Sequence, residues 1–245
     1  MNETMRMRVL TTLPVIYLFL TIFPLRNAVG NFYALSGVLL LSTFFLARGR
    51  KYDAHKLLGI TLVVFASIGL SAATILTIEK IELLKDPKHV TSCSVSPVIS
   101  CSPVIASPQA SAFDHIPNPI FGIFGFGAVL TAGMTLIAGA RKLARPWWLT
   151  LMAGVVFGTV FSIWLIHEGV YEIGALCLYC MSVWMVTFSL FWFVLSHIIA
   201  QKQLSLNTTL NTFIVKNRDN LIAGTIGVIV LLLYFRWSDY WNSLF

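Results

Sequence analysis

Charged residues are scarce in this 245-residue chain: Asp, Glu, Lys and Arg make up only 11% of it, and just 10 residues are acidic. A soluble globular domain carries about 25% charged residues, so this chain has too little charge to cover a surface exposed to water. The same scarcity excludes a disordered chain and a coiled coil. Hydrophobic residues reach 57%, which indicates an integral membrane protein.

Long windows of the sequence contain no charged residue, and a helix that spans a bilayer needs about 20 mostly apolar residues. Four windows meet this length easily: Leu57–Ile78, Asn118–Ala140, Pro146–Ile166 and Ile173–Ser196. Three weaker windows are Val9–Leu25, Asn27–Ala47 and Leu221–Phe235, of which the last is short for a span. We therefore predict an all-α integral membrane protein with seven transmembrane helices.

Lys and Arg gather on the segments that face the cytoplasm if the N-terminus lies inside. Those segments hold Arg6, Arg8, Arg48, Arg50, Lys51, Lys56, Arg141, Lys142, Arg145, Lys202, Lys216 and Arg218. The outer side holds only Arg26, Lys80, Lys85, Lys88 and Arg236. The net charge of +7 is thus explained by cytoplasmic loops, and we expect no nucleic-acid partner.

The first window has an alternative interpretation as a cleaved signal peptide. Arg6 and Arg8 precede its apolar run, and Ala28-Val29-Gly30 resembles a cleavage site. Because the apolar part of a signal peptide is only about 7–15 residues long, we favour a retained helix. Every later helix keeps the same orientation in both cases.

All four cysteines fall on the outer side in this topology. Cys93 and Cys101 lie in the longest polar segment, Glu79–Pro117, whereas Cys177 and Cys180 lie near the start of a later helix. No cytoplasmic loop contains a cysteine. This distribution is typical of an oxidising compartment, where disulfides form and persist.

Cys177 and Cys180 form a C-x-x-C motif in the first turns of the helix that we expect to begin near Ile173. Their spacing puts both sulfur atoms on one helical face, close enough to form a disulfide. The helix N-terminus favours a thiolate, whereas burial among apolar side chains opposes it. A redox-active pair, a structural disulfide and two packed cysteines are all compatible with this motif alone.

Cys93 and Cys101 form a second pair, in a region that prolines at 97, 103, 108, 117 and 119 keep out of a long helix. A dithiol on a flexible loop can swing between a soluble partner and a membrane-embedded site, and a static loop disulfide is the alternative. With two pairs, thiol–disulfide exchange can pass electrons from a water-accessible pair to one beside a lipid-soluble acceptor, most simply a quinone.

Together these features resemble the vitamin K epoxide reductase (VKOR) family, including its prokaryotic disulfide-generating members. The resemblance covers about Leu57 to Ser196, four helices in which the cysteine loop follows the first and C-x-x-C opens the fourth. Its marks are Cys93 with Cys101 eight residues later, Ser107 six residues after that, Asn118–Gly122 at the next helix start, and Gly174–Cys180. It implies a four-helix transmembrane core, and the three weaker windows depart from the family pattern by adding about three transmembrane helices, two before this core and one after it.

On this basis we divide the chain into three parts. Residues 1–56 form two N-terminal transmembrane helices, 57–199 form the catalytic core with an exofacial cysteine loop at 79–117, and 200–245 form a cytoplasmic linker and a last helix. The part after Gln201 contains no cysteine and is too short for a fused thioredoxin-like domain. The resemblance therefore implies a separate exofacial thioredoxin-like donor, with the protein in the inner or plasma membrane.

The resemblance also implies a role for each cysteine. Cys180 faces the quinone and forms a charge-transfer or covalent adduct with it. Cys177 resolves that adduct and then exchanges with Cys101. Cys93 completes the loop disulfide and receives electrons from the partner.

Four further residues are expected near the quinone. Asn118 would donate a hydrogen bond to a quinone carbonyl, where an amide stabilises growing negative charge, or would serve only as a helix cap. Ser107 would support the active geometry, or be an ordinary turn residue, and Phe121 would line the quinone slot. Trp184 stands where some family members have a pocket tyrosine; it would stack on the quinone ring, or simply pack in the core.

Two glycine groups are expected to serve as close contacts between helices rather than as part of the quinone slot. They are Gly122, Gly125 and Gly127 in one window, and Gly154 and Gly158 in the next.

Three alternatives remain open at this point. The quinone substrate could be of the menaquinone, ubiquinone or vitamin K type, or could be a quinone epoxide; no metal is expected for this chemistry. A soft metal bound by the four cysteines with His89 or His115 is a second hypothesis, although zinc sites usually use C-x-x-C for both pairs. A non-catalytic membrane scaffold with two disulfides is a third.

Overall fold

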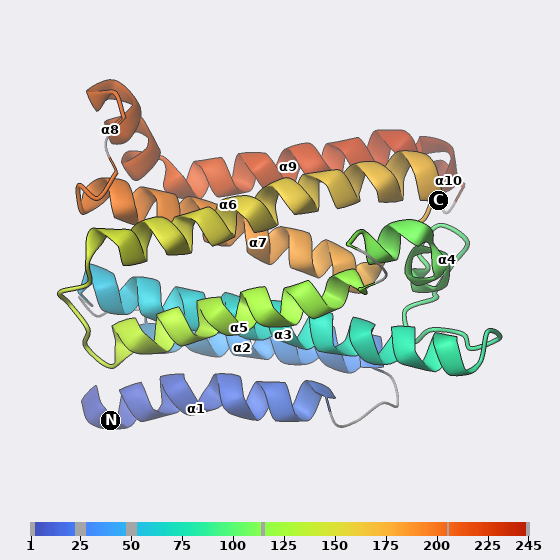
Figure 1. Cartoon of the computed structure of the whole chain (residues 1–245), viewed down its shortest axis with the longest axis horizontal. Coiled ribbons are helices and arrows are strands. Elements are labelled where there is room, and N and C mark those ends of the chain that lie inside the picture. The colour runs from blue at the N-terminus through green and yellow to red at the C-terminus, as the bar shows by residue number, and fades with distance from the viewer. Residues whose placement is uncertain (1–2, 23–27, 48–52, 114–115, 205, 244–245) are drawn as a thin grey trace.

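The computed structural model describes residues 3–22, 28–47, 53–113, 116–204 and 206–243, which are predominantly helical (Figure 1). Over these residues there is no β-strand, and the only β-type pairings are two isolated bridges, Ile99 with Leu176 and Phe113 with Ile116. The all-α class predicted from the uncharged windows is confirmed.

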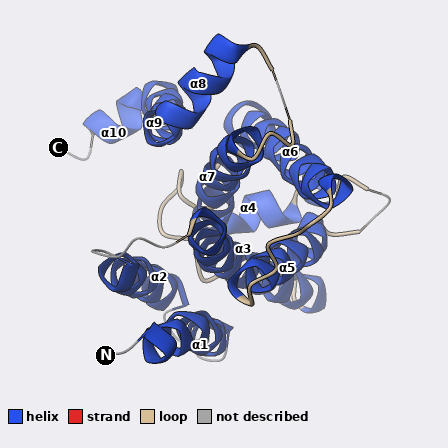
Figure 2. Ribbon diagram, turned by 90° about the vertical axis from the view of Figure 1, so that its left-hand side faces the viewer, coloured by secondary structure: helices blue, strands red, loops and turns tan. Residues whose placement is uncertain are grey.

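Four long helices form a central bundle: α3 (Ala54–Lys85), α5 (Asn118–Ile137), α6 (Arg145–His167) and α7 (Leu178–Ala200). Seen end-on they form a ring, and the short helix α4 (Cys101–Ala106) lies toward its far end (Figure 2). Each of the four long helices coincides with one of the four strongest apolar windows. A helix that is apolar on all sides is stable only when other helices or lipid surround it. The predicted four-helix core is confirmed.

The remaining helices lie outside this ring on two sides (Figure 2). On one side are α1 (Glu3–Ile22) and α2 (Ala28–Ala47); on another are α8 (Thr208–Lys216), α9 (Arg218–Arg236) and α10 (Ser238–Asn242). Among the described residues, five helices are long and apolar enough to cross a membrane: α3, α5, α6 with its extension, α7 and α9. In α2 a shorter apolar stretch, Val29–Phe44, is present. The start of α1 and the cysteine loop lie at opposite ends of the bundle (Figure 1).

The boundary between α6 and α7 differs from the prediction. From the end of α6 the chain continues into a π-helical turn, Glu168–Ile173, which ends at Gly174 with a φ of 71°. Glycine adopts such a left-handed conformation without steric cost. Helix α7 then begins at Leu178, not near Ile173. The charged residues Glu168 and Glu172 mark the break itself, but hydropathy does not mark the later start of α7, because the residues from Ile173 to Cys177 are uncharged and mostly apolar.

Glycines allow a very close approach of α3 and α5, which pack extensively on each other. A Cβ atom at Gly59 would lie 2.9 Å from the carbonyl oxygen of Gly133, and one at Gly133 would lie 2.9 Å from that of Gly59. At both positions, therefore, any larger residue would force the two helices apart.

The prediction that two groups of glycines serve as helix contacts was only partly right. A Cβ at Gly122 would lie 3.0 Å from Ala73 in α3, and one at Gly158 would lie 3.5 Å from Thr187 in α7. By contrast, a Cβ at Gly125, Gly127 or Gly154 would meet no atom of the described chain within 4 Å. For these three the prediction of a packing role was wrong.

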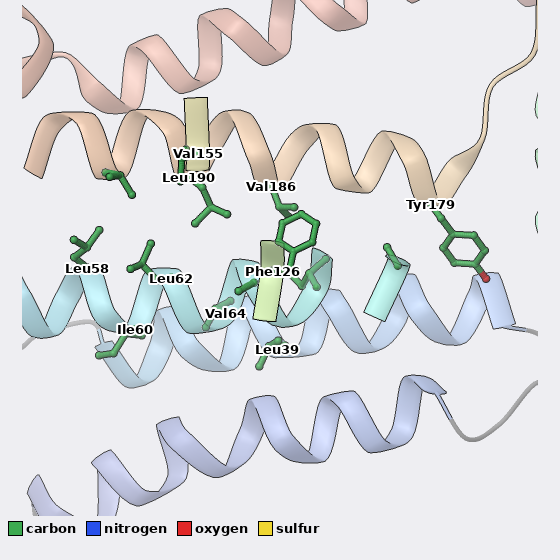
Figure 3. Packing of buried hydrophobic residues seen from close by; sticks show 14 of the residues in the cluster. Leu39, Leu58, Ile60, Leu62, Val64, Phe126, Val155, Tyr179, Val186 and Leu190 are labelled. Atoms are coloured by element: carbon green, nitrogen blue, oxygen red, sulfur yellow. The ribbon is translucent and has the colours of Figure 1, made fainter. Parts of the chain in front are cut away.

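Aliphatic side chains fill the interior of the bundle. In Figure 3, Leu58 and Leu62 of α3 point toward α7, where Leu190 points back at them. Leu62 is 0% exposed and Leu190 only 2%. Interiors packed in this way resist local rearrangement, so the bundle is a rigid support for the segments at its ends.

Candidate redox site

A disulfide between the two loop cysteines is buried at one end of the bundle. Cys93 and Cys101 are bonded, with their Cα atoms 5.5 Å apart, and both are 0% exposed. Cys101 is the first residue of α4. The structure therefore contains the loop disulfide that the resemblance implied. It differs from the expected water-accessible pair, because in this conformation both sulfur atoms are covered.

Polar contacts hold the cysteine loop in this buried position. The carboxylate of Glu79 accepts a hydrogen bond from the backbone N–H of Ser92 at 3.0 Å and lies 2.9 Å from Nε2 of His89. The hydroxyl of Thr91 lies 2.9 Å from that of Ser102. Buried polar groups are tolerated when they are hydrogen-bonded, so a loop rich in Ser and Thr can pack against an apolar bundle.

A parallel β-bridge connects the cysteine loop to the residues before C-x-x-C. The backbone N–H of Ser100 donates to the carbonyl of Leu176 at 2.9 Å, and the N–H of Leu176 donates to the carbonyl of Val98 at 2.8 Å. Ser100 immediately precedes Cys101, and Leu176 immediately precedes Cys177. As a result the Sγ atoms of Cys101 and Cys177 lie 3.0 Å apart.

The two cysteines of C-x-x-C are free thiols with different surroundings. Cys177 is the N-cap of α7, and its Sγ accepts a hydrogen bond from the backbone N–H of Cys180 at 3.3 Å. This contact orients the Cys177 sulfur at the start of the helix, next to the loop disulfide. Cys177 is 1% exposed, whereas Cys180 is only partly buried.

Beside C-x-x-C lies a cavity of about 580 Å³, which is within the usual size range of small-molecule sites. Its walls are mostly apolar and come from all four core helices. Cys177 and Cys180 both border it. So do the four residues that the resemblance placed near a quinone: Ser107, Asn118, Phe121 and Trp184. The cavity also explains why Gly125 and Gly154 have open space beside them, since both line it.

Asn118 is buried, and its side chain is bonded to the turn that precedes α5. Its Nδ2 donates to the carbonyl of Gln109 at 2.7 Å, and its Oδ1 accepts from the N–H of Ala112 at 2.9 Å. The N-cap of α5 is Pro117, with no side-chain cap bond, so the alternative of Asn118 as a helix cap was wrong. An amide nitrogen carries two protons, and these contacts use only one of them.

Trp184 is 3% exposed, and its Nε1 is buried without a hydrogen-bond partner among the described residues. A buried unpaired donor costs about 1–3 kcal/mol, so an unpaired N–H on a residue that lines the cavity is a candidate to bind a ligand acceptor. The side chain thus lies both in the core and at the cavity, which reconciles the two interpretations of the sequence.

Ser107 and Phe121 also line the cavity. The Ser107 hydroxyl donates to the carbonyl of Val104 at 2.8 Å, as expected of a turn residue between two short helices. The ring of Phe121 contacts that of Phe113 edge to face, with centroids 5.0 Å apart.

Glu79 is a site residue that sequence reasoning missed. It was treated only as the start of a polar segment, yet it is 7% exposed and anchors the residue before Cys93. The signal available in the sequence was its position directly after the uncharged window Leu57–Ile78, where a continuing helix carries it into the bundle.

The cysteines also bear on the soft-metal hypothesis. The sulfur atoms of Cys93, Cys101 and Cys177 all lie within 4.8 Å of one another. Metals bind thiolates, and two of these sulfurs are joined in a disulfide in this structure. His89 contacts Glu79, and His115 lies outside the described residues.

Comparison with known protein families gives one match for this site and the bundle around it. Residues 60–195 match the model of the vitamin K epoxide reductase family. This match includes the four core helices, the cysteine loop and C-x-x-C, and it spans more than half of the chain.

Proposed function

The chain belongs to the vitamin K epoxide reductase family and is an integral membrane thiol oxidoreductase, and from this we propose its specific reaction. Electrons pass from a separate thioredoxin-like protein to the loop pair Cys93/Cys101, then to Cys177/Cys180, and finally to a quinone. The net result is a disulfide in the partner and a reduced quinone.

One observation above all supports this relay: the 3.0 Å contact between the Sγ atoms of Cys101 and Cys177. Thiol–disulfide exchange requires one sulfur to attack another and form a mixed disulfide. A mixed disulfide between Cys101 and Cys177 would join the loop pair to the C-x-x-C pair. A merely structural loop disulfide gives no reason for a free thiol to lie in contact with it.

The internal transfer conserves electrons and protons. A Cys101 thiolate attacks Cys177 in an oxidised C-x-x-C, and Cys180 leaves as a thiolate. Cys93 then attacks Cys101, which releases Cys177 and restores the loop disulfide. The arrangement with a loop disulfide and two free C-x-x-C thiols corresponds to the state after this step.

The quinone step uses the cavity. Cys180 attacks the quinone ring, and Cys177 then attacks Cys180, so that the disulfide forms as the hydroquinone leaves with two electrons and two protons. Asn118 and Trp184 donate to the quinone oxygens through the amide proton and the indole N–H that are free. Phe121 packs against the ring, and Ser107 maintains the turn before α5.

The mostly apolar cavity suits a lipid-soluble quinone of the menaquinone, ubiquinone or vitamin K type, and a quinone epoxide is the close variant. We place the cysteine end of the bundle on the outer, periplasmic side of the cell membrane and the N-terminus in the cytoplasm. The burial of Cys93 means that the loop must open before a protein donor reaches it.

The direct test is quinone reduction by the purified protein with a small dithiol, comparing wild type with Cys180→Ser. Wild type should turn over and show a transient thiolate–quinone charge-transfer band. The Cys180→Ser variant should show neither, because no thiol remains to attack the ring. The proposal would be refuted if Cys180→Ser retained turnover, or if a variant that lacks all four cysteines were as active as wild type. Stoichiometric bound metal in the reduced protein would instead favour the soft-metal alternative.

A further inference from the structure

Helices outside the matched segment contact the C-x-x-C motif directly, beginning with α2. The hydroxyl of Tyr33 donates a hydrogen bond to the backbone carbonyl of Leu178 at 2.7 Å. Leu178 lies inside the motif, immediately after Cys177. The Tyr33 oxygen in turn accepts from the hydroxyl of Ser182 at 2.9 Å, so the tyrosine proton is left to point at Leu178.

A second contact from α2 reaches the other residue within the motif. Phe32 is 1% exposed, and its ring packs edge to face on Tyr179 with centroids 5.2 Å apart. The Tyr179 hydroxyl lies 3.4 Å from that of Ser92, the residue before Cys93. Helix α2 therefore contacts both residues between the C-x-x-C cysteines and reaches the cysteine loop through one of them.

Helix α9, which packs on α7 outside the ring, supports the same segment from a different side than α2 (Figure 2). Nε of Arg236 donates to the carbonyl of Val170 at 3.2 Å, in the π-helical turn that leads to C-x-x-C. Trp237 packs in one buried cluster with Val170 and Leu176. The backbone before and after Cys177 is thus tied to two helices that the family match does not include.

We propose that Tyr33 is a positioning residue of the relay, through which α2 holds Cys177 against Cys101. The inference rests on the proposed function, since it assigns α2 a part in the same exchange. Its physical basis is that two thiols exchange only if the fold keeps their sulfur atoms in contact. The Leu178 carbonyl belongs to the residue directly after Cys177. The hydroxyl of Tyr33, on a different helix, holds this carbonyl in place.

The test measures how strongly the fold holds Cys101 and Cys177 together. In a Cys93→Ser/Cys180→Ser background, oxidised glutathione converts the two remaining thiols to one internal disulfide and two reduced glutathione molecules. The equilibrium constant, followed by alkylation and mass spectrometry over a series of glutathione ratios, is their effective concentration. Adding Tyr33→Phe should lower it roughly fivefold, which is the loss expected for one net hydrogen bond. Ser182→Ala should also lower this effective concentration, but by less, because it removes only the hydroxyl that donates to Tyr33.

Tyr17→Phe is the matched control. It also removes one hydrogen-bonded tyrosine hydroxyl, which lies 2.9 Å from the Ser36 hydroxyl between α1 and α2, so the hydrogen bond it loses does not involve C-x-x-C. This variant should leave the effective concentration unchanged. If the parent forms no Cys101–Cys177 disulfide, the relay itself is wrong. If the parent forms it and Tyr33→Phe matches Tyr17→Phe, the relay stands and the role of Tyr33 is refuted.

Discussion

At the scale of single residues, the two C-x-x-C cysteines differ in what surrounds their sulfur atoms. Cys177 lies against the loop disulfide and accepts a backbone N–H, whereas Cys180 is the less buried of the two and borders the cavity. One thiol is therefore suited to exchange with sulfur and the other to attack a ligand. Trp184, whose indole N–H is unpaired among the described residues, lines the same cavity and is our proposed donor to that ligand.

Trp184→Phe tests this donor. The variant keeps an aromatic ring at the cavity wall but removes the N–H, so we expect the KM for quinone to rise about fivefold, the value of one hydrogen bond. Trp192→Phe is the control, because its Nε1 donates to Thr225 of α9 at 3.0 Å and does not border the cavity. Equal KM values for the two variants would remove Trp184 from the quinone site.

At the scale of elements, the contact between α3 and α5 determines how the bundle closes around the cavity. Gly133→Ala should destabilise the protein by about 1–3 kcal/mol, because its Cβ would overlap the backbone of α3. Gly127→Ala, in the same helix but with open space beside it, should be neutral or slightly stabilising. Thermal unfolding in detergent measures both, and a similar Tm for the two variants would contradict the tight contact.

The cysteine loop is a second element with its own prediction. In Cys93→Ala and Cys101→Ala variants, turnover with a small membrane-permeant dithiol should survive, since that reductant reaches Cys177–Cys180 directly. Turnover with a thioredoxin-like protein donor should be lost, because a folded protein cannot reach the Cys177–Cys180 pair directly. Parallel assays with both donors distinguish the two cases, and equal loss with both would make the loop disulfide structural.

The elements also show how far sequence could predict this protein. Uncharged windows located the four core helices, because lipid and helix packing demand them, and the resemblance paired the cysteines. The start of α7 at Leu178 could not be predicted, since the residues from Ile173 to Cys177 are uncharged and only the left-handed conformation of Gly174 delays the helix. The burial of Cys93 could not be predicted either. A segment rich in Ser and Thr is normally expected to face solvent, and the sequence does not show that these hydroxyls hydrogen-bond to one another. The contact of Tyr33 with Leu178 joins residues 145 positions apart and left no local pattern.

At the scale of the whole molecule, the orientation in the membrane follows from the basic residues and remains a prediction. In a background without native cysteines, Lys88→Cys should react with a membrane-impermeant maleimide added to intact cells, because Lys88 is exposed at the cysteine end. Asn207→Cys, exposed next to α8, should react only in inverted vesicles. The reverse labelling pattern would place the redox site in the cytoplasm.

The complete burial of the loop disulfide has a consequence for how the protein meets its two substrates. While Cys101 touches Cys177, the pair is sealed from any protein outside; once the loop opens to a partner, that contact is broken. In the proposed relay, exchange with the donor and exchange between Cys101 and Cys177 therefore occur in turn and never at the same time. Each opening then passes a single pair of electrons, and the proposed quinone never meets the donor thiols directly.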